Sequence, residues 1–488
     1  MKNLRQKTVS GLKWNYLATI VNFFAQIGYT AVMARLLDPK AFGMVALAGV
    51  ILRFGVYFSQ IGVGQAIIQK EKLSNLEIRS AFTVSVFLGL IFIVFVWALS
   101  PFIRFLYDQP ILVPIVRFLA VSLLINNLAA TAVSLLRREM RFKHLAVVQI
   151  VSQILSFAAV GIPAAFMGFG VWSLVFANLM HNAIICVGAY SLVRHDLRFL
   201  FEWKTYRPLF SFGSRISVIS FFEFLGSSVD TLLIGRYLGP VQLGFYNRSY
   251  MLINLPIYQF SNSLSQVLFP SLSKLQDDIA KIREVFLKSL SLISFFIFPI
   301  CIAVSIVAEL VIRIVLGPGW EPSVIILRIL ALAMPFSLVS HYAGVLCDST
   351  GKLNAKMVIQ TSTFFVLGLL IYFIGKKGIV YVALIVLFVA IIRTMAFIIL
   401  TSRIVIIDFR RLYNSFALPF LYSLCIATSL FTMKNIFRPE TNLYVLCLSF
   451  LTIYIVISLV FIRQNDYLRN YIINNNIYNR IIRILATK

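Results

Sequence analysis

Long apolar stretches separated by short polar segments are the dominant pattern of this 488-residue chain. Most stretches run to about 20 residues or more, the length at which a helix crosses a hydrocarbon core of about 30 Å. The chain is therefore expected to be an all-α polytopic membrane protein with about 14 transmembrane helices. The predicted spans lie near residues 14–35, 41–68, 81–103, 111–136, 145–167, 170–193, 210–234, 242–269, 287–312, 323–347, 355–374, 379–401, 415–433 and 442–462.

Composition and charge agree with this assignment. The chain is 60% hydrophobic with a mean hydropathy of +0.90, whereas soluble domains are typically about 45–50% apolar. The net charge of +26 could indicate nucleic-acid binding, but such proteins gather their basic residues on one face. Here the basic groups alternate with the spans and fall mostly on one side, as the positive-inside rule requires. We expect both termini in the cytoplasm and no nucleic-acid partner. The inner groups are 2–13, 137–143, 194–207, 274–288 and 463–488.

Two stretches fit one pattern, R-x-L-x-P-x-x-[FL]-G, and lie 201 positions apart. They are residues 35–43 (RLLDPKAFG) and 236–244 (RYLGPVQLG), called the paired turns below. Further matches follow in the same order, which predicts that spans 1–6 and 7–12 are two copies of one six-helix unit facing the same way. These matches are 115–120 with 326–331 and 141–143 with 352–354 at an offset of 211, and 170–174 with 378–382 at 208.

Each residue type in the paired turns has an expected structural role. The proline sets a tight corner between two spans, and the glycine permits close helix approach. The arginine can extend to the outer headgroups. The residues concerned are Arg35, Pro39 and Gly43 in the first copy, and Arg236, Pro240 and Gly244 in the second.

The chain resembles the polysaccharide-exporter branch of the MOP flippase superfamily in its fourteen predicted spans, its duplication and the amino-acid sequence of three stretches. This branch includes O-antigen, colanic-acid and teichuronic-acid flippases. The stretches are 10–39 (SGLKWNYLATIVNFFAQIGYTAVMARLLDP), 135–143 (LLRREMRFK) and 229–250 (VDTLLIGRYLGPVQLGFYNRSY). The resemblance implies a V-shaped, two-lobed transporter. Residues 1–208 would form an N-terminal lobe, 209–403 a C-terminal lobe, and 404–488 two appended spans with a basic cytoplasmic tail.

The resemblance also implies a cargo and a location. The cargo would be a polyprenyl-diphosphate-linked oligosaccharide, moved from the inner to the outer leaflet of the bacterial cytoplasmic membrane. The product would enter lipopolysaccharide, exopolysaccharide or another surface glycan. Membrane lipids would surround the protein, and a glycan polymerase and glycosyltransferases are further candidate partners.

Charged residues inside spans are costly and serve as candidate functional residues. Arg53 lies mid-span with Gln60 two turns further on and no acidic residue in its own hairpin. It could pair with Glu223 of the other lobe or bind an anion, and a guanidinium group suits a diphosphate. Arg393 is another candidate.

Asp230 and Arg248 lie about nine residues on either side of the turn near Gly239, hence at similar depth. They could form a structural ion pair or a cavity-lining pair that opens during transport. Glu223 and Asp230, seven apart on one helix face, could exchange protons or act as static partners of arginines. Asn22 and Gln26 share a polar helix face with Thr19, which Asn15 extends backwards, and they complete the candidate cavity.

Other functional classes have less support. The four histidines and five cysteines have no metal-ligand spacing, so we expect no metal site. The sequence also has no ATP-binding loop and no nucleophile motif, so we expect no cofactor or catalytic residue, and the protein is not expected to be an enzyme. A glycosyltransferase or polymerase would need longer outer loops. The alternative is a cation-coupled drug antiporter of the multidrug-extrusion branch, which generally has twelve spans and an acidic cavity.

Overall fold

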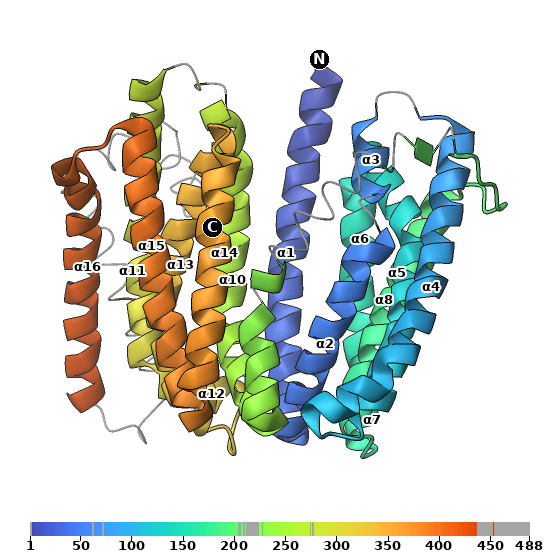
Figure 1. Ribbon diagram of the computed structural model, residues 1–488, viewed down its shortest axis with the longest axis horizontal. Helices are drawn as coiled ribbons and strands as arrows, with labels where there is room; N and C mark the ends of the chain where they lie inside the picture. Colours follow the sequence, from blue (N-terminus) through green and yellow to red (C-terminus); the bar gives the residue numbers. More distant parts are fainter. Residues whose placement is uncertain are drawn as a thin grey trace, which may run out of the picture. The chain divides into compact units, whose positions relative to one another are not determined.

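The computed structural model describes residues 2–60, 63–70, 73–203, 206–207, 210, 224–226, 228–273, 275, 278–436 and 452. All regular elements within these ranges are helical (Figure 1). They are α1 Lys2–Leu36, α2 Pro39–Gln60, α3 Val63–Gln69, α4 Asn75–Tyr107, α5 Leu112–Arg138, α6 Phe142–Leu155, η1 Ser156–Gly161, α7 Ile162–Phe166, α8 Val171–Val193, α10 Gly239–Ser273, α11 Ile279–Ile306, α12 Ala308–Val315, α13 Pro322–Ser349, α14 Leu353–Phe373, η2 Gly375–Lys377, α15 Ile379–Val405 and α16 Phe409–Ile436.

Ten helices in the described part of the chain are long and apolar enough to cross a membrane. They confirm ten of the predicted spans, so the chain is a multi-pass membrane protein. The predicted spans 242–269 and 415–433 lie within α10 and α16. The predicted spans 210–234 and 442–462 fall largely outside the described residues.

The chain divides into two compact units that are discontinuous in sequence. Unit 1 contains Met1–Pro256, Ile312–Ile326 and Gln360–Ile385. Unit 2 contains Ile257–Val311, Leu327–Ile359 and Val386–Lys488. Packing defines these units, so the lobe boundaries predicted from the repeat, at 208 and 403, stay a prediction.

In unit 1, α5 is the central helix and packs against α2, α3, α4 and α8 (Figure 1). A helix that is buried on several sides needs apolar residues all round, and α5 supplies them. Its buried side chains include Leu112, Ile115, Val116, Leu119 and Leu123.

The helix predicted over 145–167 is not a uniform α-helix. A six-residue π-helical segment, η1, separates α6 from α7. Such insertions are rare and are frequent at functional sites. α1 packs along α6 and α7, which brings η1 close to the polar face of α1.

In unit 2, α11 packs along α16 (Figure 1). The rings of Phe295 and Tyr422 stack with centroids 4.6 Å apart, and Ala303, Ile426 and Leu430 complete this contact. Helix α16, expected as an appended span without a repeat partner, is thus packed against the core of this unit.

Candidate functional site

The polar face of α1 is the first candidate region in unit 1. Thr19, Asn22 and Gln26 are three and four residues apart, so they share one side of the helix. Tyr29 and Thr30 continue this stripe by three and four residues. Thr30 donates a weak hydrogen bond to the sulfur of Met251 on α10, at 3.9 Å.

Two members of this stripe make contacts with the next helices. Gln153 of α6 donates a hydrogen bond to Oε1 of Gln26 at 3.1 Å. The ring of Tyr29 stacks on Phe157 of η1, with centroids 3.8 Å apart. Asn22 Oδ1 and the Tyr29 hydroxyl are buried without a hydrogen-bond partner among the described residues. A buried polar atom left without a partner costs about 1–3 kcal/mol, so both atoms are suited to a polar ligand.

Arg248 of α10 lies beside this region. Its guanidinium group stands over the ring of Phe42 at 4.7 Å, and Nη2 donates to Oδ1 of Asn247 at 2.8 Å. Its Nε is buried with no hydrogen-bond partner in the described part of the chain. The Tyr29 hydroxyl lies within electrostatic range of the same guanidinium group. Arg248 thus carries a half-buried positive charge whose hydrogen-bonding groups are only partly satisfied.

The possible ion pair between Asp230 and Arg248 is not formed. Asp230 instead accepts a hydrogen bond from the Tyr246 hydroxyl at 2.6 Å and from the backbone N–H of Thr231 at 2.7 Å. The predicted pair depended on the similar depth of Asp230 and Arg248 on the hairpin. The Tyr246 hydroxyl, on the same hairpin, donates to the Asp230 carboxylate and takes the place of Arg248 as its partner.

Of the remaining predicted residues of unit 1, Arg53 is the one whose side chain the structure describes. Arg53 lies on α2, has an exposed side chain, and makes no hydrogen bond or ion pair within the described residues. Gln60 is the last residue of α2. Glu223 lies outside the described residues, so its predicted pairing with Arg53 stays a prediction.

The paired turns contact each other within unit 1. A Cβ atom added to Gly43 would overlap the carbonyl oxygen of Pro240, and one added to Gly244 would overlap that of Pro39. The glycine of each turn therefore lies against the proline of the other. The expected close approach is confirmed, and it joins the two predicted repeats to each other.

The two arginines of the paired turns do not need lipid headgroups as partners. Arg35 donates to the carbonyl oxygens of Ile314 and Val315 at 2.6 and 3.0 Å. Arg236 donates to the carbonyl oxygen of Leu106. Both acceptor sets lie in the last turn of a helix, α12 and α4, where a cation is favourable. Arg35, in the first copy, thus contacts α12, the short helix that follows the third span of the second copy. Arg236, in the second copy, contacts the end of α4, the third span of the first copy.

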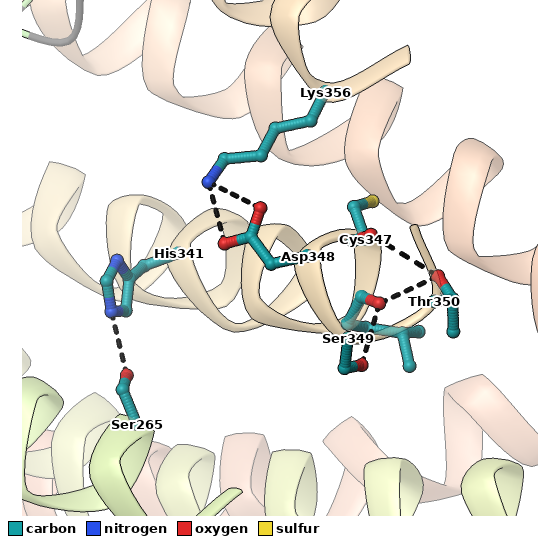
Figure 2. Close-up of polar contacts among 8 residues, drawn as sticks. Ser265, His341, Cys347, Asp348, Ser349, Thr350 and Lys356 are labelled. Carbon is teal, nitrogen blue, oxygen red and sulfur yellow. Dashed lines mark hydrogen bonds and ion pairs between the residues drawn. The ribbon is translucent and has the colours of Figure 1, made fainter. Parts of the chain in front are cut away.

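Unit 2 holds the last predicted site residue, Arg393 on α15. Its neighbour Thr394 hydrogen-bonds to Ser340 of α13 at 2.9 Å, and Arg393 itself lies within electrostatic range of His341, the next residue of α13. Figure 2 shows His341 pointing toward Ser265 of α10, from which its Nε2 is 2.9 Å away. No group of three or more metal-ligating residues occurs in the described ranges.

Sequence reasoning missed Tyr29, Tyr246 and Gln153. Tyr29 could have been found, because it extends the three-and-four spacing of Asn22 and Gln26. Gln153 and Tyr246 carried no such signal, since their roles depend on contacts that only the fold creates.

Comparison with known proteins finds similar sequences over most of the chain. Lipopolysaccharide biosynthesis protein WzxC of Escherichia coli (strain K12) is 25% identical over 426 residues, 86% of each chain. Teichuronic acid biosynthesis protein TuaB of Bacillus subtilis (strain 168) is 24% identical over 381 residues, 78% of each chain.

Solved structures share the fold at low identity. Lipid II flippase MurJ in an inward closed conformation gives a TM-score of 0.75 at 15% identity, covering 93% of this chain and 99% of that one. An inward-facing multidrug resistance MATE family transporter of the MOP superfamily gives 0.59 at 14%, covering 79% and 98%. The family described as polysaccharide biosynthesis protein matches residues 32–325, more than half of the chain. The chain therefore belongs to the polysaccharide biosynthesis protein family.

Proposed function

We propose that this protein is a flippase for polyprenyl-diphosphate-linked oligosaccharide repeat units. It moves them from the inner to the outer leaflet of the bacterial cytoplasmic membrane, where they enter a surface or exported polysaccharide. Family membership, the fold shared with a lipid II flippase and the names of its relatives support this proposal. Translocation requires binding and release, so no covalent chemistry is assigned to the chain.

The observation that carries the proposal is the state of Arg248. Its guanidinium group has no carboxylate partner among the described residues and retains a buried, unsatisfied Nε. A phosphate group can accept hydrogen bonds from such a donor bidentately. The unsatisfied Tyr29 hydroxyl lies within electrostatic range of this guanidinium group, and the unsatisfied Asn22 Oδ1 lies two turns away from Tyr29 along α1. Both can bind polar groups of the same cargo.

The second candidate is a cation-coupled drug antiporter. A multidrug transporter shares the fold at a TM-score of 0.59, and fold alone does not assign a substrate. Three of the charged candidate residues are cationic, Arg53, Arg248 and Arg393, against two acidic ones, Glu223 and Asp230. Asp230 is already hydrogen-bonded to Tyr246, so the candidate charges favour an anionic cargo. An export antiporter for cations would instead need an excess of acidic groups in its cavity.

Deletion of the gene in a strain without another flippase tests the function. Lipid-linked oligosaccharide should accumulate on the inner leaflet, where a membrane-impermeant oxidant cannot reach its sugars, and surface glycan should be lost. A plasmid copy of the wild type should restore both. Unchanged surface glycan in the deletion strain would contradict the assignment, and increased drug sensitivity with normal glycan would favour the antiporter.

Location and partners complete the proposal. Both termini lie in the cytoplasm, on the side of the basic loops. A glycan polymerase and glycosyltransferases act before and after the flippase and are candidate partners. Co-purification from detergent-solubilised membranes with the tagged protein would identify them.

A further inference from the structure

Unit 2 contains a cluster of polar and charged side chains on helices α10, α13, α14 and α15. Its centre is His341 on α13, whose side chain is exposed within this unit. Nε2 of His341 lies 2.9 Å from the hydroxyl of Ser265 on α10 (Figure 2). Two helical turns further along α13, Asp348 accepts hydrogen bonds from Lys356 of α14 at both carboxylate oxygens, at 2.9 and 2.8 Å.

Among the described residues, the charged groups within electrostatic range of His341 come from three helices. They are Asp348 on α13, Lys356 on α14 and Arg393 on α15. Helix α10 contributes no charge here, because its only charged residue is Arg248, 17 positions before Ser265. With neutral His341 the cluster has a net charge of +1, since Lys356 already neutralises Asp348.

The cluster is present in one copy of the repeat only. At the offset of 211 that aligns this region, His341 corresponds to Ala130 and Lys356 to Leu145. At the offset of 208 that aligns the last span, Arg393 corresponds to Ile185. The first copy builds the corresponding helices without these three side chains, so they are specific to the second copy. Ionisable groups inside spans are candidates for function.

We propose that His341 binds the proton that couples transport to a proton gradient, an inference that rests on the proposed flippase function. Imidazole is the only group of this cluster whose ordinary charge change falls between about pH 5 and 8. A proton taken from water on one side binds a free ring nitrogen and raises the net charge of the cluster from +1 to +2. Its release to water on the other side restores neutral imidazole.

Binding of this proton changes the contacts between the helices around His341. His341 and its neighbours link four helices, through Ser265 on α10, Lys356 on α14, and Thr394 bonded to Ser340 on α15 and α13. A cationic His341 repels Lys356 and Arg393, and it attracts the carboxylate of Asp348 away from Lys356. Protonation therefore changes the contacts of α13 with α14 and α15. Unit 2 then has one arrangement with neutral His341 and another with protonated His341.

A leaflet-distribution assay tests the coupling. Wild-type protein is reconstituted with a fluorescent polyprenyl-diphosphate oligosaccharide, and a membrane-impermeant quencher measures its outer-to-inner ratio. A gradient of about one pH unit should shift this ratio by up to about tenfold for each coupled proton. His341→Gln should lose the shift, and the matched control His144→Gln, on exposed α6 surface, should keep it.

The outcomes separate the two proposals. Lipid that the wild type moves without any response to the gradient, or an unchanged response in His341→Gln, overturns the proton site and leaves the flippase assignment intact. A wild type that moves no lipid under any gradient overturns the flippase function itself.

A direct measurement covers the case in which His341→Gln does not fold. Imidazole NMR signals of the labelled wild-type protein should include one that titrates between about pH 5 and 8 and that is absent from His341→Gln. Ser265→Ala, which removes the hydroxyl partner, should move the midpoint of this signal and leave those of the other three histidines in place. A His341 signal that does not titrate in this range, or that ignores Ser265→Ala, contradicts the proposal.

Discussion

At the residue scale, Arg53 and Arg248 differ in their surroundings. Arg248 is half-buried, over the ring of Phe42 and bonded to Asn247, so its removal affects packing as well as charge. Arg53 is exposed and makes no contact of this kind within the described ranges. Loss of function at Arg53 would therefore report on the cargo more cleanly than loss at Arg248.

Arg53→Ala should reduce export by about ten- to hundredfold, which corresponds to the roughly 1.5–3 kcal/mol of a hydrogen bond to a charged group. The amount of protein in the membrane and its unfolding temperature should not change. Surface glycan and detergent-solubilised melting curves measure the two effects. Arg104→Ala, another exposed arginine, on α4, serves as a control and should retain export. Full activity of Arg53→Ala would remove this residue from the site.

Residue-level reasoning succeeded where spacing along one helix decides the outcome. The polar face of Asn22 and Gln26 was predicted because a helix places such residues together. The Asp230–Arg248 pair was wrong because a competing hydroxyl, that of Tyr246, approaches from the same hairpin. The charge of a residue and its approximate depth along a helix can be predicted from the sequence. Which of several nearby groups will bond to it can be decided only when the side-chain positions are known.

At the scale of helices, the paired turns make a reciprocal contact that their sequence does not reveal. The repeat predicted two similar corners, and the structure places the glycine of each corner against the carbonyl oxygen of the other. Arg35 was expected to extend to headgroups, yet it donates to Val315, 280 positions away. Nothing local to residues 35–43 indicates that distant acceptor.

Gly43→Ala and Gly244→Ala should each destabilise the protein by about 1–3 kcal/mol, the usual cost of an added methyl group without space. The double variant should cost less than the two single effects together, because both methyl groups separate the same two turns. Gly49→Ala, on the same helix as Gly43, has open space around the added atom and should be neutral or slightly stabilising. Unfolding midpoints in one detergent compare all four, and strictly additive or negligible costs would contradict the reciprocal contact.

At the scale of the whole molecule, hydropathy predicted the helices well because membrane thickness fixes their length. It did not predict the π-helical segment η1 or the packing of α16 on α11. Both features depend on how helices pack against each other. Hydropathy does not reveal this packing, because a helix face that contacts lipid is as apolar as one that contacts another helix. The compact units likewise follow contacts, whereas the predicted lobes follow the sequence repeat, so their boundaries differ.

The orientation of the chain in the membrane is the property on which the direction of export depends. Helix α5 joins a basic loop, with Arg137, Arg138, Arg141 and Lys143 around it, to the loop 108–111, which has no basic residue. The positive-inside rule puts the basic end in the cytoplasm. In intact cells a membrane-impermeant maleimide should label Gln109→Cys and should label Glu139→Cys only after permeabilisation, each compared with the parent protein. The reverse pattern would place the paired turns on the cytoplasmic side and would contradict transport from the inner to the outer leaflet.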